Sequence, residues 1–486
     1  MMKIAVLTDI HFGEAHPVGS RRRCEIADIL MERAVRRLNA LVHPDVVLVL
    51  GDLVDAGGTS GTEKRLQTLK DILDKLEAPY VAIPGNHDKD INQFYRVFER
   101  PADWLDIKGV RFLPFIDPEE PGYNARRRQE DIDRIKSARA GFNGQIVALQ
   151  HVCLFPPELG RVTPYNYINA PDIIAALKEA GVVLSISGHH HHGAETVTDG
   201  PVSFVTAPGL CEAPFPFMTI TLNGNHVETQ RHELAMSPEL NLVDNHLHTQ
   251  LAYCAENMTV ERTIALARDF GIAGITFTEH SGQLYYDRKA YWGNAWVQAG
   301  IEGAEAAFNR MPDYLKLKDA YEDDFARFSL EVDCDARGGL VVRTEDARQF
   351  DGLMGTVHAL PGLTRETPPR RSDLDDFLFL VEAMCRQGVR ILAHPLRIFR
   401  RFGWDAPPEL FEPTARLLKR YNVAAEINFH TNQPPVEFVR CCLDTGVKFS
   451  FGSDSHNLAE IGDFAYHIAL LRQAGYDGSL GDVLLQ

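Results

Sequence analysis

One pattern, repeated in both halves of the chain, restricts the fold more than any other feature of the sequence. A short run of apolar, often β-branched residues ends each time at a polar residue whose side chain can bind a metal ion. In the first half these runs occupy residues 3–7, 46–50, 80–83, 146–149 and 182–186, and helical stretches such as 27–41 and 63–76 separate them. Near-continuous apolar strands that alternate with helices predict the buried, layered sheets of an α/β protein.

The second half repeats the pattern, with strands ending at residues 245, 278, 332, 357, 393, 428 and 452. Such a series of strand–helix units predicts a barrel-like βα domain with its chemistry at the C-terminal ends of the strands. Residues 281–328 interrupt the series and are rich in aromatic residues, among them Tyr285, Tyr286, Tyr291, Trp292 and Trp296. This helical insertion either covers the site or, in the interpretation we favour, packs its aromatic residues into a small core of its own.

The length of the chain predicts two domains, because 486 residues exceed what one hydrophobic core usually holds. The strand that begins at Phe217 runs into a tight Asn-Gly turn, which predicts antiparallel pairing at the end of the first domain. Residues 235–241 form the expected linker because Pro238 interrupts both helix and strand periodicity. We therefore expect domains at residues 1–235 and 241–486.

Composition limits the partners and the compartment. The formal net charge of −17 argues against a nucleic-acid polymer as partner, although bound metal ions would still attract a small anionic substrate. The eight cysteines are scattered without C-x-x-C spacing, which favours reduced thiols in the cytoplasm. No apolar run approaches the ~20 residues that span a bilayer, and the apolar run 4–7 is short for a signal peptide. We expect a cytoplasmic protein away from the membrane, and homo-oligomerisation stays open.

The polar residues at the strand ends of the first half form a first constellation. Its parts are Asp9-Ile-His11, Asp52 with Asp55, the run Gly85-Asn86-His87-Asp88, His151, and His189 with His191 in a run of four histidines. Carboxylate, imidazole and amide donors together suit Mn, Fe or Zn. Two such ions ~3.5–4 Å apart can bind a phosphoryl oxygen and activate a water molecule.

This order of motifs resembles the calcineurin-like metallophosphoesterases, and among them the class III cyclic-nucleotide phosphodiesterases. The resemblance covers residues 2–230 and implies a four-layer αββα sandwich with a dinuclear metal site. It places Asp9, His11 and His191 on one metal and Asn86, His151 and His189 on the other, with Asp52 bridging both. It also implies that His87 is the general acid, oriented by Asp55, and that His190 and His192 point away from the metals.

The second half offers a second constellation at its strand ends. It comprises His246, His248, Glu279, His280, Glu331, Asp333, His358, His394, Asp454 and His456. The abundance of imidazoles indicates transition metals rather than calcium.

These motifs resemble the PHP family (polymerase and histidinol phosphatase) from residue 241 to the C-terminus, which implies a distorted (βα)7 barrel. The resemblance places His246, His248, Glu331 and Asp454 on one metal, lets Glu331 bridge to a second metal on His358 and His394, and assigns His280 and His456 to a third. Cys254 stands where many family members carry a further ligand, and either a thiolate ligand or a buried free cysteine fits, so two or three metals (Mn, Fe or Zn) are expected. Glu279 replaces a usual aspartate and is expected to support the ligands.

Arginines near the two constellations have two interpretations. The triplets 21–23 and 126–128 either reach a phosphate at the mouth of the site or, in the interpretation we favour, form solvated helix faces. Arg365, Arg370 and Arg371 are expected to be exposed, whereas for Arg397 a phosphate clamp and an exposed loop residue are equally weighted.

The two constellations together predict a metal-dependent phosphoric ester hydrolase with two sites. The first domain would hydrolyse a small linear or cyclic phosphodiester, and the second a phosphomonoester or related ester. Two alternatives remain: one working site with the other domain as a binding or regulatory module, or a nuclease, against which the acidic charge counts.

Overall fold

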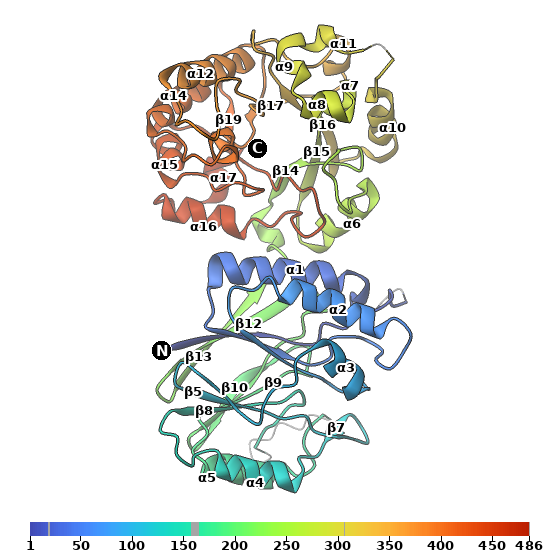
Figure 1. The fold of residues 1–486 in the computed structure, drawn as a ribbon, viewed down its shortest axis with the longest axis vertical. Helices are drawn as coiled ribbons and strands as arrows, with labels where there is room; N and C mark the ends of the chain where they lie inside the picture. Colours follow the sequence, from blue (N-terminus) through green and yellow to red (C-terminus); the bar gives the residue numbers. More distant parts are fainter. Residues whose placement is uncertain (18–19, 157–164, 306, 486) are drawn as a thin grey trace. The chain divides into compact units, whose positions relative to one another are not determined.

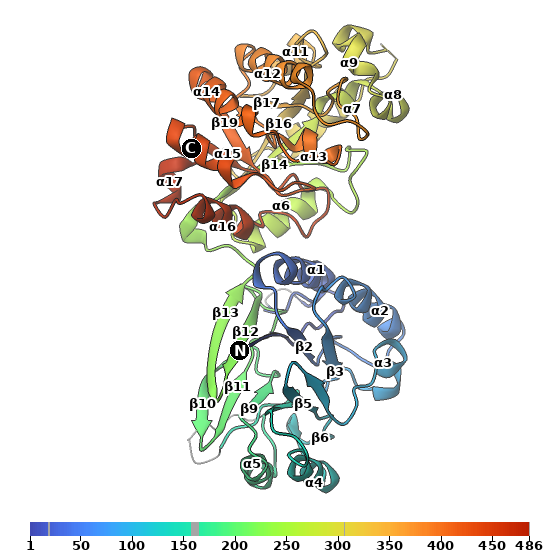
Figure 2. The same cartoon turned by 60° about the vertical axis from the view of Figure 1, so that its left-hand side comes forward.

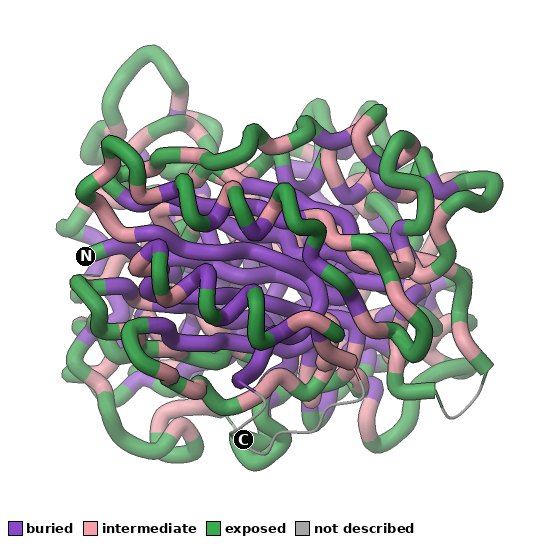
Figure 3. Tube along the Cα trace, turned by 90° about the horizontal axis from the view of Figure 1, so that it is seen from below, coloured by how far each residue is buried: buried purple, intermediate pink, exposed green. Residues whose placement is uncertain are grey.

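The computed structural model describes residues 1–17, 20–156, 165–305 and 307–485. The chain divides into two compact units, Met1–Ala235 (unit 1) and Met236–Gln486 (unit 2). None of the helices in the described ranges has the length and apolarity that crossing a membrane requires. Buried residues follow the strands, and exposed residues lie in the outer loops and on the outer faces of helices (Figure 3).

Unit 1 is built on two sheets that pack face to face. The first has the order β13-β12-β1-β2-β3, with strands His226–Glu233, Pro216–Asn223, Met2–Leu7, Val46–Leu50 and Tyr80–Ile83. The second has the order β10-β11-β9-β8-β5-β4, with strands Ala194–Asp199, Val202–Thr206, Leu184–Ser187, Gln145–Leu149, Val110–Pro114 and Leu105–Ile107. One apolar cluster joins the sheets and contains Ile4 and Leu48 of the first with Phe112 and Val147 of the second.

Helices cover the two outer faces of this pair of sheets (Figure 2). Helices α1 (Ala27–Arg37), α2 (Thr62–Leu73) and α3 (Ile91–Val97) lie on the side of the first sheet. Helices α4 (Gln129–Ser137) and α5 (Ala170–Glu179) bury Ile135 and Leu177 against the second sheet. The predicted helices 27–41 and 63–76 are therefore present, the first ending in a π-helical turn at Leu38–Val42.

The predicted Asn-Gly hairpin is confirmed. Strand β12 pairs antiparallel with β13, and Asn223 faces His226 across the turn at Gly224. A second, short hairpin joins β6 (Glu119–Glu120) to β7 (Asn124–Ala125). No apolar run marks this hairpin in the sequence, and it was not expected.

Unit 2 contains a seven-stranded sheet in chain order in which all paired neighbours are parallel (Figure 1). Its strands β14 to β20 are Val243–Leu247, Gly274–His280, Ala326–Asp333, Met354–Thr356, Ile391–Leu392, Ala424–Ile427 and Phe449–Phe451. Its longer helices are α6 (Val260–Asp269), α10 (Met311–Tyr321), α12 (Arg371–Arg386), α14 (Phe411–Tyr421), α15 (Val436–Thr445) and α16 (Ala465–Gln473). Shorter helices are α7 (Ser281–Tyr285), α8 (Arg288–Trp292), α9 (Ala295–Ala299), α11 (Thr344–Ala347), α13 (Arg397–Arg401) and α17 (Leu480–Val483).

The first and last strands of this sheet nearly close it into a barrel. Leu247, the last residue of β14, bridges Ser455 beyond β20, and the backbone N–H of Asp454 donates to the carbonyl of His246 at 2.7 Å. The carboxylate of Asp244, which is wholly buried, accepts hydrogen bonds from the N–H groups of Ser453 at 3.0 Å and Gly462 at 2.9 Å. One side chain thus spans the seam between the two ends of the sheet.

The expected insertion is helical but ends earlier than expected, because Phe328 already belongs to β16. Tyr285, Tyr286, Tyr291 and Trp296 are buried, whereas Trp292 is 45% exposed. The ring of Tyr291 stacks on Trp296 at 6.4 Å between centroids and also lies 6.3 Å from the ring of His280. The insertion therefore has its own aromatic core, and that core borders the site.

Candidate metal centres

The loops after β1, β2 and β3 of the first sheet and after β8 and β9 of the second converge in unit 1. Within each group the strands are parallel neighbours, so their C-terminal ends lie at the same edge of the sheet. The loops bring together the predicted ligands Asp9, His11, Asp52, Asn86, His151, His189 and His191, which we call candidate centre 1. Two imidazole nitrogens face each other here, with Nε2 of His11 3.2 Å from Nε2 of His191. Oδ1 of Asp9 lies 3.5 Å from Nε2 of His191.

A second group of donors adjoins the first. Nε2 of His151 lies 3.1 Å from Oδ1 of Asn86 and 3.1 Å from Nδ1 of His189. Asp52 stands between the groups, since its Oδ2 is 3.2 Å from Nε2 of His151 and 3.7 Å from Nε2 of His11. Nitrogen and oxygen ligands ~2.1 Å from an ion lie about 3 Å from each other, which is the spacing within both groups.

The backbone of candidate centre 1 is unusual. Asp9, His11 and Asp52 each have φ of 53°, and His189 has φ of 67°. Residues other than glycine rarely have a backbone in this left-handed region, and those that do are concentrated at functional sites. The backbone after each strand therefore adopts a strained conformation that places the ligand side chain in the centre.

The second nitrogen of each ligand imidazole has its own partner. Nδ1 of His191 lies 2.7 Å from the carboxylate of Glu212, and Nδ1 of His151 lies 2.6 Å from the carbonyl oxygen of Leu50. Nδ1 of His11 lies 3.1 Å from Oδ1 of Asp55, and Nε2 of His189 lies 3.2 Å from the carbonyl oxygen of Tyr123. These contacts fix ring orientation and tautomer, as supporting residues do around metal sites. No motif in the sequence pointed to Glu212.

His87 is held by Asp55 in a way that differs from expectation. Nδ1 of His87 lies 2.7 Å from the backbone carbonyl oxygen of Asp55, whereas the Asp55 carboxylate contacts His11 at 3.1 Å, His16 at 3.0 Å and Arg22 at 3.1 Å. One residue thus orients His87 through its main chain and His11 through its side chain.

The pKa shifts around candidate centre 1 reflect its concentrated charge. Burial lowers the pKa of His151, but the carboxylates of Asp52 and Asp9 and the hydrogen bond to Leu50 together raise it to about 9. Burial also lowers the pKa of His191, and the bond to Asp9 raises it to about 11. Burial and the charge of Asp52 raise the pKa of Asp88 to about 7, and Asp88 accepts backbone hydrogen bonds from Leu53, Val54 and Gly85. Buried carboxylates that hold protons on imidazoles also attract cations.

Two arginines of the sequence triplets are not on solvated faces. Arg22 is half-buried and contacts Asp55, whereas Arg21 is exposed. Arg127 is 1% exposed and pairs with Asp117 at 2.8 Å, with its guanidinium 3.7 Å from the centroid of the Phe115 ring. The expectation of a solvated face is therefore wrong for Arg22 and Arg127. A charge run in sequence does not show which of its members folds inward.

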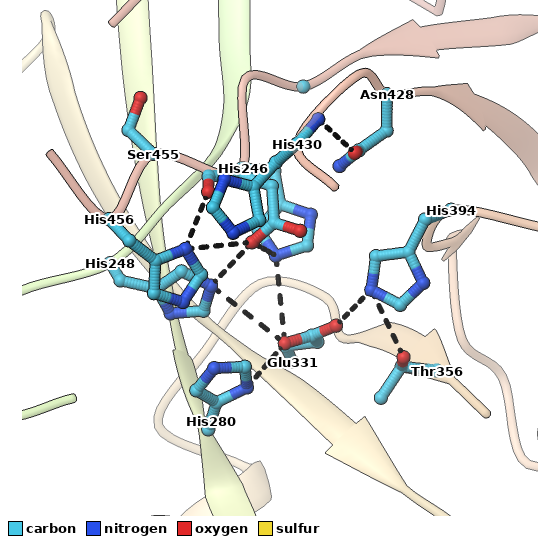
Figure 4. Close-up of polar contacts among 12 residues, drawn as sticks. His246, His248, His280, Glu331, Thr356, His394, Asn428, His430, Ser455 and His456 are labelled. Carbon is cyan, nitrogen blue, oxygen red and sulfur yellow. Dashed lines mark hydrogen bonds and ion pairs between the residues drawn. The ribbon is translucent and has the colours of Figure 1, made fainter. Parts of the chain in front are cut away.

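In unit 2 the predicted ligands also converge, around Glu331 (Figure 4). We call His246, His248, His280, Glu331, His358, His394, Asp454 and His456 candidate centre 2. Oε2 of Glu331 lies 2.6 Å from Nδ1 of His280 and 3.6 Å from Nε2 of His246. Its other oxygen lies 2.8 Å from Nε2 of His394 and 3.3 Å from Nε2 of His358. The carboxylate of Glu331 therefore has one oxygen directed at each of two donor groups.

Asp454 extends the first of these groups. Its Oδ1 lies 2.9 Å from Nε2 of His248 and 3.5 Å from Nε2 of His246. His456 packs its ring against that of His248 at 4.4 Å between centroids, and Asp454 and His394 have left-handed φ values of 52° and 26°.

Arg397 lies inside candidate centre 2. Its Nη1 donates to Oδ2 of Asp454 at 2.5 Å, and its Nη2 lies 2.7 Å from Nε2 of His394 and 3.2 Å from Nε2 of His358. Burial and then the charge of Arg397 lower the pKa of His394 to about 4. Arg365, Arg370 and Arg371 are exposed, as expected.

Cys254 lies at the border of candidate centre 2. Its sulfur is 3.7 Å from Nε2 of His280, and burial raises the pKa of the thiol to about 12. Glu279 accepts hydrogen bonds from Thr249 and lies 3.4 Å from Nδ1 of His248, behind the ligand atoms.

Three supporting residues of unit 2 were missed in the sequence. Glu426 binds Nδ1 of His246 at 2.8 Å, and Glu460 binds Nδ1 of His430 at 3.0 Å. The ring of His430 stacks on His456 at 4.4 Å. A charged residue inside the apolar strand Ala424–Ile427 was a usable signal for Glu426, because an unpaired buried carboxylate is costly.

Both sets of residues fit metal ions. Within the described ranges, Oδ1 of Asp9, Nε2 of His246 and Nδ1 of His248 are buried and make no hydrogen bond. Nδ1 of His280 and Oε2 of Glu331 likewise make no hydrogen bond of acceptable geometry, although they face each other at 2.6 Å as an ion pair. Groups of three potential ligand atoms lie close together in both units, including Asp52 with His151 and His189, and His248 with His280 and His456. Unsatisfied buried polar atoms are rare, and ones that converge on carboxylates and imidazoles are those a cation would satisfy.

Comparison with known proteins gives the N-terminal part a family. Residues 2–193 match the model of the Calcineurin-like phosphoesterase family. A "Probable histidinol-phosphatase" of Deinococcus radiodurans is 25% identical over 260 residues, covering 48% of this chain and 94% of the relative. A "Probable cyclic nucleotide phosphodiesterase" of Synechococcus sp. is 26% identical over 201 residues, covering 39% of this chain and 73% of the relative.

Among solved structures, a dimetal phosphatase from Danio rerio matches 48% of this chain and 96% of its own length, with 16% identity and a TM-score of 0.35. The N-terminal ~190 residues form a calcineurin-like phosphoesterase domain, and the chain is a metal-dependent phosphoric ester hydrolase.

Proposed function

We propose that the chain carries two phosphoesterase sites, one in each unit. Unit 1 hydrolyses a small linear or cyclic phosphodiester. Residues 241–486 of unit 2 form a PHP domain that hydrolyses a phosphomonoester or a related ester. The observation that carries the proposal is the presence of two separate sets of converging carboxylates and imidazoles, each with buried donor atoms that lack a hydrogen-bond partner among the described residues.

In unit 1, Asp9, His11 and His191 would hold one ion and Asn86, His151 and His189 the other, with Asp52 between them. Bound Mn, Fe or Zn ions supply Lewis-acid chemistry, polarising the phosphoryl group and activating water. His87 lines the cleft beside these residues, and the Asp55 carbonyl oxygen holds its Nδ1. This leaves Nε2 free to donate a proton to the oxygen of the departing alcohol, which is the role of a general acid.

In unit 2, Glu331 would bridge two ions, with His246, His248 and Asp454 on one side and His358 and His394 on the other. His280 and His456 would hold a third ion, with Cys254 as its further ligand if the thiol deprotonates. Arg397 contacts the ligands of both groups, so its planar guanidinium is placed to bind two oxygens of a phosphate once ions take over its present partners.

The experiment assays purified protein, loaded with Mn, Fe or Zn in turn, on a panel of mono- and diesters. Asp52→Asn is expected to lower diester hydrolysis at least 100-fold and leave monoester hydrolysis unchanged, and Glu331→Gln to do the reverse. Metal analysis of each variant should show ions lost from one unit only. Asp71→Asn and Glu261→Gln, at exposed positions of the two units, serve as matched controls.

Two outcomes would contradict the proposal. If Asp52→Asn and Glu331→Gln both leave every hydrolytic step unchanged, neither set of residues carries catalysis. If one substitution abolishes all activities and the other none, the chain has a single working site.

A further inference from the structure

A cleft of about 350 Å³ opens beside candidate centre 1. Four residues of the centre line it, together with two tyrosines, Tyr123 and Tyr165. The members of the centre are Asp52, Asn86, His189 and His191, and the remaining lining residues are Arg22, His87, His190 and His192. The two rings are 5.9 Å apart between centroids and nearly perpendicular, at 77°. Tyr165 also meets the ring of His189 edge-on at 5.2 Å. Aromatic surface therefore adjoins a predicted metal ligand.

Tyr123 owes its position to the short hairpin β6–β7. Gly122 and Tyr123 are both left-handed, with φ of 81° and 59°, which reverses the chain in the three residues between the strands. The carbonyl oxygen of Tyr123 lies 3.2 Å from Nε2 of His189, so the main chain at the tip is fixed to the metal centre. The ring of Tyr123 is not part of a core, because the residue is 53% exposed.

Tyr165 reaches the cleft because its segment pairs with the same hairpin. The backbone N–H of Ala125 donates to Asn166 at 3.1 Å, and that of Ile168 donates to Ala125 at 3.0 Å. The side chain of Asn124 accepts from the N–H of Asn166 at 3.1 Å. The two tyrosines thus stand on neighbouring, hydrogen-bonded segments of backbone.

The base of the hairpin is rigid. Arg127 is buried and pairs with Asp117, which also accepts a hydrogen bond from the hydroxyl of Tyr167 at 2.6 Å. Oδ1 of Asn169 accepts a hydrogen bond from the backbone N–H of Arg127 at 3.1 Å, and Nδ2 of Asn169 donates to the carbonyl oxygen of Arg127 at 2.9 Å. Among the described residues Nη1 of Arg127 has no hydrogen-bond partner, but its other guanidinium nitrogens, Asp117, Tyr167 and Asn169 are all bonded. This buried network holds the surface above it, so the tyrosines are in place before a ligand binds.

We infer that Tyr123 and Tyr165 form an aromatic platform that selects phosphate esters carrying a flat unsaturated ring over alkyl and glyceryl esters. The inference rests on the proposed function of unit 1 and names its substrate class. The ring of Tyr123 is exposed and that of Tyr165 is half-buried. A flat ring of the ligand gains about 1–3 kcal/mol by stacking on such a surface, and an alkyl group gains much less. Arg22, on the same cleft, adds a positive charge for the anionic end of the ligand.

The experiment measures binding of two non-hydrolysable probes, phenylphosphonate and methylphosphonate, to the metal-loaded full-length protein by calorimetry. Wild-type protein is expected to bind phenylphosphonate about tenfold more tightly than methylphosphonate. Tyr123→Asn with Tyr165→Ala should reduce this preference to less than about twofold and leave the affinity for methylphosphonate unchanged. Asparagine suits position 123 because it tolerates a left-handed backbone. Tyr123→Phe, which keeps the ring, should keep the preference.

Three results overturn the platform: no phenyl preference in the wild-type protein, an unchanged preference in the double variant, or loss of methylphosphonate binding in that variant, which would make the tyrosines structural supports. Hydrolysis is assayed in parallel with an aryl and a glyceryl diester, where the double variant should raise KM for the aryl ester alone. If the phosphonates bind with the expected preference and no ester is hydrolysed, the proposed function of unit 1 fails and the platform stands.

Discussion

The two candidate centres use the same donor chemistry at different degrees of enclosure. In candidate centre 2 the side chains of His246, His248, Glu331 and Asp454 are 0% exposed. In candidate centre 1 the side chain of His191 is 13% exposed, and a cleft of about 350 Å³ reaches its partners. The open centre can admit an ester with a bulky group, whereas the enclosed one suits a small phosphate held on several sides.

The centres also differ in how they balance charge. Arg397 lies among the ligand atoms of candidate centre 2 and contacts Asp454 directly. Arg22 stays at the edge of candidate centre 1 and contacts Asp55, which holds His11 rather than an ion. Enclosure thus comes with an internal cation, because buried carboxylates without a counter-charge are costly.

Metal removal should separate the units most clearly. We expect a chelator to remove ions from candidate centre 1 first, because that centre is open to solvent. The loss of ions should lower the Tm of unit 2 more, by roughly 10 °C or more, because the buried carboxylates of candidate centre 2 cannot be hydrated. Metal analysis over time and hydrogen exchange resolved by unit provide the measurement. Equal rates of ion loss from the two centres and equal destabilisation of the two units would contradict the assigned difference in enclosure.

Arg397→Met tests the internal cation. In metal-free protein it should lower the free energy of unfolding of unit 2 by about 3 kcal/mol, because Asp454 and Glu331 lose their counter-charge. Arg22→Met, at a partly exposed ion pair, should cost unit 1 less than about 1 kcal/mol. Denaturant unfolding of the metal-free proteins measures both, and similar losses would contradict the assigned difference.

Asp244→Ala tests how the sheets are held together. In unit 1, the first strand β1 is hydrogen-bonded to a neighbouring strand on each side. In unit 2, the first and last strands are instead linked through the side chain of Asp244, which binds the backbone of Ser453 and Gly462. The substitution should destabilise unit 2 by about 2 kcal/mol, because the N–H groups of Ser453 and Gly462 stay buried without their acceptor. Asp319→Ala, on the surface of the same unit, is the control and should cost less than about 0.5 kcal/mol. Hydrogen exchange at residues 453–462 should report the change.

His467 makes a smaller, pH-dependent contribution to the free energy of unfolding of unit 2. Burial lowers its pKa from 6.5 to about 4, so the folded state binds the proton more weakly than the unfolded state. The stabilisation is full above pH 6.5 and declines as pH falls towards 4, by about 1–2 kcal/mol between pH 6.5 and 5. His467→Gln should flatten this part of the stability curve of unit 2. A curve of unchanged slope would rule out His467 as its source.

The strands were predictable where they are buried on both faces. Runs such as Val46–Leu50 and Tyr80–Ile83 are apolar because helices and a second sheet cover them, and the structure keeps their bounds. The hairpin β6–β7 and the strand Ala194–Asp199 are polar, so no pattern marked them. The inward turn of Arg127 depends on Asp117, ten residues away, and a charge run cannot show it.

The candidate ligands were predictable because each follows its strand directly. Their supports were not: Glu212 reaches His191 from 21 residues away, and Glu426 reaches His246 from 180 residues away. Only the fold brings such pairs together. The role of the hairpin that carries Tyr123 was also not predictable from the sequence, since it follows from contacts to His189 and Asn166 that only the fold creates.

The nearly closed sheet of unit 2 has a consequence for folding. His246 lies on its first strand and His248 directly follows that strand, whereas Asp454 follows its last strand. The proposed ligands of one ion therefore come from opposite ends of the domain, with His248 and Asp454 206 residues apart. An ion bound there would act as a covalent-like cross-link over a long loop, restricting the unfolded chain as a disulfide does. Ion uptake and ring closure would then be one cooperative event.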